Sequence, residues 1–486
     1  MVNSVAKKLE KELIEIVEVP KDDINWSTVS LSDVLNKGKR LEASGFNIEK
    51  IRYEEILKSN KYPLITLLNE KYVDDCYNGA RTKREYISPK HKNAVMFLGG
   101  SEILDVYPKT EKYLDYTNSK YESYKVKKND VLLTCSGTLG KVSLVSDSIK
   151  NSLISQHVIK IRLKELQGYL YAFLKTDLAQ WLIKSNKYGS LVSHIEPEHL
   201  NEILIPDAPI ELKKEIHDLV IESYSSRDES NRLIDEATKI MIDELELPPI
   251  EELKKEAFSY SKDINSFSTK LSDLNGRLEG NYHLPIIEVT EKYLSKKASL
   301  IKLNSEDIVE KIILAGVFKR NYVQKGHGYP FLGGKEITQL CPETDKYLSK
   351  ITHKKRYDKE LKVKENWILV TDRGTIGKTV LVPKQMDGMA VSQNVLKIVP
   401  KMHSGYLFCF LNSEYGQLLI KRQSYGSVVN MIDDICMGNI KIPMLSNKDK
   451  LNEIDNMVLE SNKLRYIAYK KEQEAINIMN KEVLGL

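Results

Sequence analysis

The segment at residues 368–382, ILVTDRGTIGKTVLV, carries residue types that bind nucleotide phosphates in a P-loop. The P-loop pattern is G-x-x-x-x-G-K-[ST], and its first glycine would fall on Asp372. Its lysine must open a helix, whereas residues 379–382 read TVLV and favour a strand. A second segment at 131–145, VLLTCSGTLGKVSLV, repeats the Gly-Thr-x-Gly-Lys core but has Val142 where a magnesium-binding hydroxyl is needed. Two copies that share a strand-turn-strand pattern and lack the phosphate ligands predict β-hairpins, and they exclude an NTPase.

Other catalytic patterns are also incomplete. An amino-methyltransferase would carry Asn, Asp or Ser before a Pro-Pro pair and an aromatic residue after it, but the only such pair lies in LPPI at 247–250. A nuclease centre could be sought in Asp207, Glu211 and Lys213. These residues stand together at a helix start, where Asp207 is expected to be the N-cap. His157 has no second His or Cys at ligand spacing, so no metal site is predicted.

The bulk composition is that of an ordinary soluble protein. Its 486 residues suit roughly two to four domains. No run of about eighteen apolar residues predicts a transmembrane helix, and residues 1–20 lack the apolar core of a signal peptide. Their apolar spacing predicts a short amphipathic helix that ends near Pro20. Five cysteines without a C-x-x-C pair fit a reducing cytoplasm, and a net charge of +5 permits an anionic partner without requiring one.

An internal repeat organises the chain. Residues 135–195 align with 372–432 without a gap, and 26 of the 61 positions are identical, which is too many for chance. Upstream, FLGGSEI at 97–103 corresponds to FLGGKEI at 331–337. The chain is therefore predicted to contain two copies of one unit of about 240 residues.

Within each copy, short β-rich runs bounded by Gly, Asn and Ser predict hairpins. Helical spacing of apolar residues follows at 167–186 and 404–423, and then a long charged amphipathic stretch. The apolar stripes of these two stretches are expected to bury each other as a coiled-coil pair. The stripes comprise Leu212, Ile216, Leu219, Leu233, Ala237, Ile240 and Met241 in copy one, and Ile454, Val458, Leu464, Ile467, Ile478 and Met479 in copy two.

Several of these segments carry a family resemblance: NDVLLTCSGTLGKVSLV, SQHVIKIRL, GYLYAFL, and the Arg-Leu-Glu of GKRLEA and GRLEGNYH. They resemble specificity subunits of type I restriction–modification systems from about residue 28 to the C-terminus. The resemblance implies an α+β fold with two β-rich globular target-recognition domains, separated by a pair of long antiparallel coiled-coil helices. The expected ranges are an N-terminal extension at 1–27, target-recognition domains at 28–210 and 258–446 (the latter including a linker), and spacer helices at 211–257 and 447–486.

The resemblance also implies a function. The chain would have no catalytic centre, bind double-stranded DNA, and direct an adenine methyltransferase and a motor-nuclease partner. S-adenosylmethionine is expected on the methyltransferase, and no cofactor is expected on this chain. Because the two copies differ, the implied target is asymmetric and bipartite. A cytoplasmic protein without membrane association is expected. The alternative is a duplicated scaffold that recruits partners through its helices, which would show no salt-sensitive binding to duplex DNA.

The candidate DNA-binding residues occupy equivalent places in the two copies. They are Lys83, Arg84, Ser136, Lys141, Gln156, His157 and Tyr188 in copy one, and Lys319, Arg320, Arg373, Lys378, Gln393, Asn394 and Tyr425 in copy two.

Different chemistry is expected of each kind of candidate. The Lys-Arg pairs could contact phosphates or a guanine, or form a solvated turn, and both interpretations stay open. Arg373 replaces a serine and is a candidate bidentate reader of guanine. Glutamine can pair with adenine, but its identical placement in both copies favours a shared structural hydrogen bond. The Gly-Thr-x-Gly-Lys core is expected to be mainly structural, and the two Tyr-Gly-Ser segments to hold a turn or touch the DNA backbone.

Overall fold

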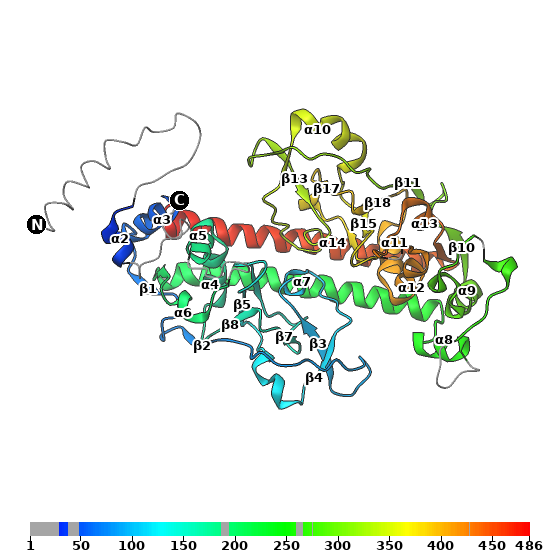
Figure 1. Ribbon diagram of the computed structural model, residues 1–486, viewed down its shortest axis with the longest axis horizontal. Coiled ribbons are helices and arrows are strands. Elements are labelled where there is room, and N and C mark those ends of the chain that lie inside the picture. The colour runs from blue at the N-terminus through cyan, green and yellow to red at the C-terminus, as the bar shows by residue number, and fades with distance from the viewer. Residues whose placement is uncertain (1–28, 37–47, 186–193, 259–265, 275, 427) are drawn as a thin grey trace, which may run out of the picture.

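The computed structural model describes residues 29–36, 48–185, 194–258, 266–274, 276–426 and 428–486 (Figure 1). The predicted N-terminal helix before Pro20 and the candidate Tyr188 lie outside these residues.

The first copy folds into an α+β domain, called domain 1 here, around an antiparallel four-stranded sheet in the order β2-β8-β5-β6. A smaller sheet has the order β4-β3-β7, and β1 pairs with β9. The strands are β1 (Leu64–Thr66), β2 (Val73–Asn78), β3 (Ala94–Leu98), β4 (Tyr113–Asp115), β5 (Val131–Thr134), β6 (Val142–Leu144), β7 (Leu153–Ile154), β8 (Val158–Leu163) and β9 (Leu204–Pro206). The helices are α2 (Leu31–Asn36), α3 (Ile48–Lys58), α4 (Gln167–Lys175), α5 (Asp177–Ser185) and α6 (Pro197–Leu200).

The second copy, domain 2, repeats this topology, which confirms the predicted repeat. Its main sheet has the order β11-β18-β15-β16, its smaller sheet β12-β14-β13-β17, and β10 pairs with β19. The strands are β10 (Ala298–Lys302), β11 (Val309–Ile313), β12 (Tyr322–Val323), β13 (Gly328–Leu332), β14 (Tyr347–Ser349), β15 (Ile368–Thr371), β16 (Thr379–Leu381), β17 (Ala390–Val391), β18 (Val395–Pro400) and β19 (Lys441–Leu445). The helices are α9 (Pro285–Lys297), α10 (Lys350–Arg356), α11 (Ser404–Asn412), α12 (Glu414–Gln423) and α13 (Asp434–Gly438).

The helical patterns predicted at 167–186 and 404–423 are each two helices rather than one. Thr176 takes an extended conformation between α4 and α5. Its hydroxyl donates to the Phe173 carbonyl and accepts from the Ala179 amide, so one side chain ends the first helix and starts the second. Ser413 makes the same contacts with Phe410 and Gly416 between α11 and α12. Hydrophobic periodicity continues across such a break, and this is why the sequence pattern missed it.

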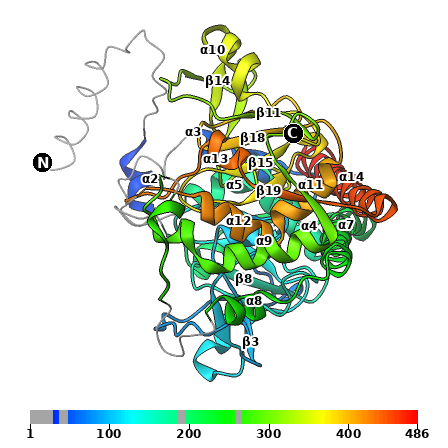
Figure 2. The same cartoon turned by 90° about the vertical axis from the view of Figure 1, so that its right-hand side faces the viewer.

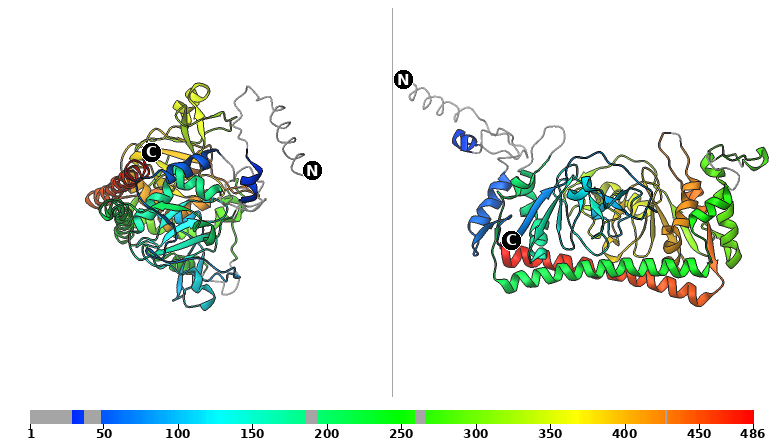
Figure 3. Two further views of the ribbon diagram at one scale, coloured as in Figure 1. Left: turned by 90° about the vertical axis from the view of Figure 1, so that its left-hand side faces the viewer. Right: turned by 90° about the horizontal axis from the view of Figure 1, so that it is seen from below.

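Two long helices, α7 (Ile210–Glu244) and α14 (Lys448–Ile478), lie side by side and antiparallel (Figures 1 and 3). The Oγ atoms of Ser230 and Ser461 lie 3.0 Å apart, and Ser223 donates to the Ala468 carbonyl at 2.7 Å. The range 211–257 assigned to the first spacer helix holds two helices. The long amphipathic stretch, expected from Leu212 to about Leu245, is α7 and ends at Glu244, and α8 (Ile250–Ala257) follows as a separate helix, because Pro248-Pro249 cannot continue a helix.

The start of α7 differs from the prediction as well. Its N-cap is Pro209, so the N-cap role predicted for Asp207 is wrong. Because β9 extends to Pro206, Asp207 lies just before the helix. Its carboxylate accepts a hydrogen bond from the Tyr72 hydroxyl at 2.9 Å and forms an ion pair with Lys213. Asp207 and Lys213 therefore have a structural role rather than a catalytic one, as expected, but Asp207 bonds Tyr72 and Lys213 instead of capping the helix.

The interface between α7 and α14 is apolar at its ends and polar in its middle. Ile216 and Met479 are buried at one end, and Met241 and Ile454 at the other. In between, the buried residues are mostly small or polar: Ser223, Ser230, Asn231, Ser461, Asn462, Arg465, Ala468 and Glu472. Ile467, assigned to the apolar stripe, is 41% exposed. The continuous apolar stripe is therefore wrong at the centre, where small residues let the helices approach closely.

Each domain packs on one end of the helix pair. The domain 1 core includes Ile216 and Val220 of α7, and the domain 2 core includes Ile234 of α7 and Ile454 of α14. Close packing requires glycine: a Cβ on Gly168 would lie 2.6 Å from the His217 carbonyl oxygen of α7. Gly405 of α11 has the same relation to α14. The two readers predicted from the sequence are thus anchored at opposite ends of one helical support.

The prediction that the helices separate the domains is wrong in one respect. The helix pair runs along one side of the molecule, and both domains lie on the same side of it (Figures 2 and 3). The domains contact each other directly, because the Val106 amide of domain 1 donates to the Thr338 carbonyl of domain 2 at 2.9 Å.

Candidate nucleic-acid interface

The two Gly-Thr-x-Gly-Lys segments are the turns of β-hairpins, as predicted, with β5 paired to β6 and β15 to β16. Gly137 and Gly140 both have positive φ angles, as do the equivalent glycines of domain 2. The Gln180 amide of α5 donates to the Gly140 carbonyl at 2.7 Å, and Gln417 of α12 bonds Gly377 in the same way. This geometry agrees with the mainly structural role expected of this core.

Strand pairing brings three candidate segments to one edge of each main sheet. In domain 1, Thr134 at the end of β5 pairs with Val158 at the start of β8, which places Ser136 next to Gln156 and His157. The end of β2 lies at the same edge, because Asn78 pairs with Ile159. The segment that carries Lys83 and Arg84 follows β2. Domain 2 repeats this arrangement with β15, β18 and β11.

An arginine–glutamine pair occurs in both clusters. Nη2 of Arg84 donates to Oε1 of Gln156 at 2.6 Å, and Nη2 of Arg320 donates to Oε1 of Gln393 at 2.7 Å. The two guanidinium groups also lie over the rings of Phe97 and Phe331, at 4.8 and 5.5 Å from the ring centroids. The sequence pattern gave no hint that these residues meet. The available signal was the phenylalanine that opens FLGG in each copy.

This pair supports the structural interpretation of the glutamine. Bidentate recognition of adenine needs both the amide oxygen and the amide nitrogen of glutamine. The oxygen already accepts from arginine in both domains, so the shared hydrogen bond favoured from the sequence is present. The arginine, positioned by the glutamine and the ring, keeps further N–H groups for a base or a phosphate.

Next to this shared pair the two clusters differ. In domain 1, the Ser136 hydroxyl and Nδ1 of His157 lie 2.7 Å apart. Burial, and then the charge of Arg84, lower the pKa of His157, so its ring is neutral at neutral pH. In domain 2, Nε and Nη2 of Arg373 both bond the buried carboxylate of Asp372, at 3.0 and 2.9 Å. That carboxylate orients Arg373, and its Nη1 atom, which bonds no other residue in the described part of the chain, can contact a base edge.

The four candidate lysines fall into two groups, one exposed and one in contact with the opposite domain. Lys83 and Lys319 are exposed and have no ion-pair partner in the part of the chain that the structure describes, as phosphate contacts require. Lys141 and Lys378 instead form ion pairs with Glu343 and Asp105 of the opposite domain. Their contact with DNA stays a prediction, and the geometry favours a role between the domains.

Tyr425 holds a turn, one of the two roles expected for it. Its backbone pairs with Met431, and its hydroxyl donates to Asp433 at 3.0 Å. Burial, together with the Asp433 carboxylate, raises the pKa of this hydroxyl to about 12, so it remains protonated. The equivalent Tyr188 lies outside the described residues.

A buried lysine lies beneath each cluster and was not singled out from the sequence. Lys160 and Lys397 are fully buried at equivalent positions of β8 and β18. Nζ of Lys160 donates to the carbonyls of Ser155 and Val158, which flank Gln156 and His157. Burial lowers the pKa of Lys160 to about 7 and that of Lys397 to about 8. The recurrence of a lysine within an apolar strand in both copies was the signal.

This burial predicts a pH-dependent stability. Between pH 7 and the ordinary lysine pKa of 10.5, the unfolded chain binds a proton that folded Lys160 does not. The free energy of unfolding should therefore rise with pH, by at most about 1.4 kcal/mol per pH unit for this group. Lys160→Met should remove that contribution, and urea unfolding at pH 7.0 and 8.5 measures it. Lys164→Met, at an exposed residue just after the strand, is the control. Equal slopes in both variants would contradict the lowered pKa of Lys160.

The described residues show three further general features. Within the described ranges, no three His, Cys, Asp or Glu side chains are grouped to hold a metal ion. Of the helices in those ranges, none combines the length and apolar character that a membrane span requires. All five cysteines are free thiols.

The architecture defines a duplicated α+β protein with two diverged polar clusters on one helical support. The chain belongs to the family of type I restriction modification DNA specificity domains, whose family model matches residues 23–231 and 303–450. This family supplies the DNA-binding, target-recognising and non-catalytic subunit of type I systems, in which it assembles with methylase and restriction subunits.

Solved structures with the same description show limited similarity. The type I restriction–modification S subunit from M. genitalium is 14% identical, with 88% of this chain and 96% of that chain covered and a TM-score of 0.32. The HsdS subunit from Thermoanaerobacter tengcongensis is also 14% identical, with 87% and 97% covered and a TM-score of 0.28. No curated protein sequence matches the chain. The family assignment therefore rests on the family model.

Proposed function

We propose that this chain reads an asymmetric DNA target in two separated parts, one through each domain. The observation that carries the proposal is the pair of equivalent clusters. Both contain an arginine held by a glutamine and a phenylalanine ring, and they differ at the neighbouring positions, with Ser136 and His157 in one and Arg373 and Asn394 in the other. A common frame with different polar groups suits two readers of different base sequences.

The helix pair supports this proposal as a coiled-coil-like spacer. The 35 residues of α7 span about 50 Å at 1.5 Å per residue. Readers anchored at its two ends can reach half-sites about one turn of DNA, about 34 Å, apart. Lys83 and Lys319 would contact phosphates beside the base contacts, which makes the affinity fall with salt.

The proposed partner proteins are those with which members of this family assemble. An adenine methyltransferase, carrying S-adenosylmethionine, would dock on the helix pair, where Ile467 leaves apolar surface exposed. A motor-nuclease subunit would join the same complex. The chain itself would bind no cofactor and would act in the cytoplasm, with access to the chromosome.

The first experiment is co-expression of this chain with the methyltransferase encoded beside it, followed by mapping of methylated adenines across the host genome. We expect one asymmetric motif in two separated parts that disappears without this chain. Exchange of residues 28–206 for those of a relative should change one half of the motif and leave the other unchanged. No new methylation, with the partner shown to be bound, would refute DNA reading and favour the scaffold alternative.

A further inference from the structure

Two loop segments cross between the domains at the middle of the molecule. They are residues 105–111, called arm 1, and residues 339–345, called arm 2, and each follows the FLGG segment of its own domain. The arms begin side by side, since Asp105 and Gln339 form an antiparallel bridge. Asp105 also accepts from Thr338 and forms an ion pair with Lys378 at 3.0 Å. From this point each arm extends onto the opposite domain.

Arm 1 docks on domain 2 and on α7. Nζ of Lys109 donates to the carbonyl and the side-chain oxygen of Asn412, at the end of α11, at 3.1 and 3.2 Å. Glu111 forms an ion pair with Lys421 of α12 at 2.6 Å. The Tyr107 hydroxyl bonds Asp235 of α7. The arm thus joins two elements of the other domain to the helical support.

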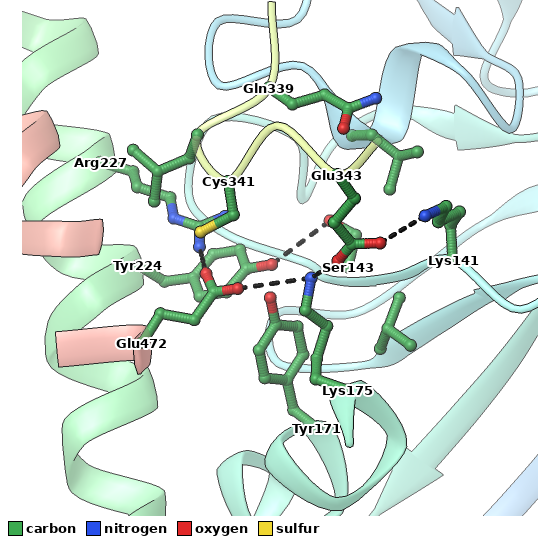
Figure 4. Close-up of a pocket in the computed structure, with 13 residues that line it drawn as sticks. Lys141, Ser143, Tyr171, Lys175, Tyr224, Arg227, Gln339, Cys341, Glu343 and Glu472 are labelled. Atoms are coloured by element: carbon green, nitrogen blue, oxygen red, sulfur yellow. Dashed lines mark hydrogen bonds and ion pairs between the residues drawn. The ribbon is translucent and has the colours of Figure 1, made fainter. Parts of the chain in front are cut away.

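Arm 2 docks on domain 1, and a chain of ion pairs connects it to the helix pair (Figure 4). Glu343 lies between Lys141 of the hairpin and Lys175 at the end of α4, and it forms ion pairs with both. Burial would raise the pKa of Glu343, but the two ammonium groups lower it to about 2, so it is charged at neutral pH. Lys175 lies 3.5 Å from Glu472 of α14, which pairs with Arg227 of α7.

The two docks differ in charge at equivalent positions. Lys109 of arm 1 and Glu343 of arm 2 hold equivalent positions, 234 residues apart. Their docking residues, Asn412 and Lys175, are also equivalent, 237 residues apart. An arm with lysine at this position would meet like charge at Lys175. Arm 1 therefore fits the dock of domain 2 and not the equivalent dock of domain 1.

We propose that the two arms form a clasp that fixes the separation and orientation of the two DNA readers. Asp105 and Glu343 are then positioning residues that decide which half-site spacing is accepted, together with the helices. The inference rests on the proposed bipartite reading. Its physical basis is that each domain contacts its own half of the helix pair: domain 1 bonds α7 at Asp228, and domain 2 bonds α14 at Asn462. Those contacts do not join the two domains to each other, whereas the reciprocal contacts of the arms at the middle do.

The test uses the complex with its methyltransferase and duplexes that carry the mapped motif, with the spacer lengthened or shortened by one base pair. In the Asp105→Asn/Glu343→Gln variant, we expect the preference for the correct spacer to fall by about fivefold or more. Discrimination against a wrong base within either half-site should stay as in the wild type. Glu229→Gln, which removes an exposed carboxylate of α7, is the control for charge.

A second variant fixes the clasp rather than loosening it. Asp105→Cys/Gln339→Cys places two thiols at the bridged positions, and oxidation should keep the spacer preference at the wild-type value. An unchanged preference in the loosened variant, or loss of binding in the oxidised one, would overturn the clasp. Failure of the wild-type complex to prefer any sequence would instead refute the proposed function, and the clasp with it.

Discussion

Substitution of Arg320 by alanine is expected to weaken binding to the cognate duplex by about tenfold to a hundredfold, the value of one good base contact. The side chain is exposed and rests against the Phe331 ring and Gln393, so little of its rotamer freedom remains to be lost on binding. The loss should fall on the half-site read by domain 2. Competition binding with duplexes mutated in one half-site at a time measures it.

Two matched variants make this result specific. Arg84→Ala should produce the same loss at the other half-site, because Arg84 holds the equivalent place in domain 1. Lys319→Ala, the neighbouring residue, should weaken binding evenly across sequences and reduce the salt slope by about one. If Arg320→Ala behaved like Lys319→Ala, the arginine would be a phosphate contact, and the readers would have to be sought among Arg373 and Asn394.

Local patterns predicted the fold well where one physical cause determines the local structure. Short β-rich runs on both sides of Gly-Thr-x-Gly predicted the hairpins, and glycines with positive φ form the turn. The predictions were wrong where tertiary contacts decide. The break at Thr176 interrupts no apolar period. The polar centre of the α7–α14 interface exists because buried serines and charged residues find partners across it, and helical periodicity cannot foresee those partners.

In the candidate site, too, the sequence predicted which residues to select but not the tertiary contacts that they make. Equivalent placement in two copies was enough to select Arg84, Gln156 and their counterparts. The hydrogen bond of Arg84 and Gln156 joins residues 72 positions apart and depends on how β2, β5 and β8 pair. Lys141 was selected by the same reasoning, yet it forms an ion pair with the other domain. A repeat preserves residues for reading DNA and residues for contact between the copies alike, and only the arrangement of the domains distinguishes the two uses.

Glu472→Ala is expected to lower the free energy of unfolding by about 3–5 kcal/mol, because it leaves buried charges without a partner. The Glu472 side chain is 1% exposed and forms ion pairs with Arg227 and, at 3.5 Å, with Lys175. Burial acts to raise the pKa of Glu472, but these two cations hold it below the ordinary value of 4.5. The stabilisation is therefore present above pH 4.5 and is lost as the pH falls through the lowered pKa. Urea unfolding of the variant measures the loss, and Glu474→Ala, on the exposed side of the same helix, is the control.

A double variant separates the value of the ion pair from the cost of an unpaired charge. Arg227→Leu/Glu472→Leu removes both buried charges together, and Lys175 keeps Glu343 as its partner. We expect it to lose less stability than Glu472→Ala alone, because apolar side chains can replace a buried pair at little net cost. A double variant as unstable as the single one would show that the network contributes through its hydrogen bonds and shape. In that case the centre of the helix pair would depend on these particular residues, and not only on charge balance.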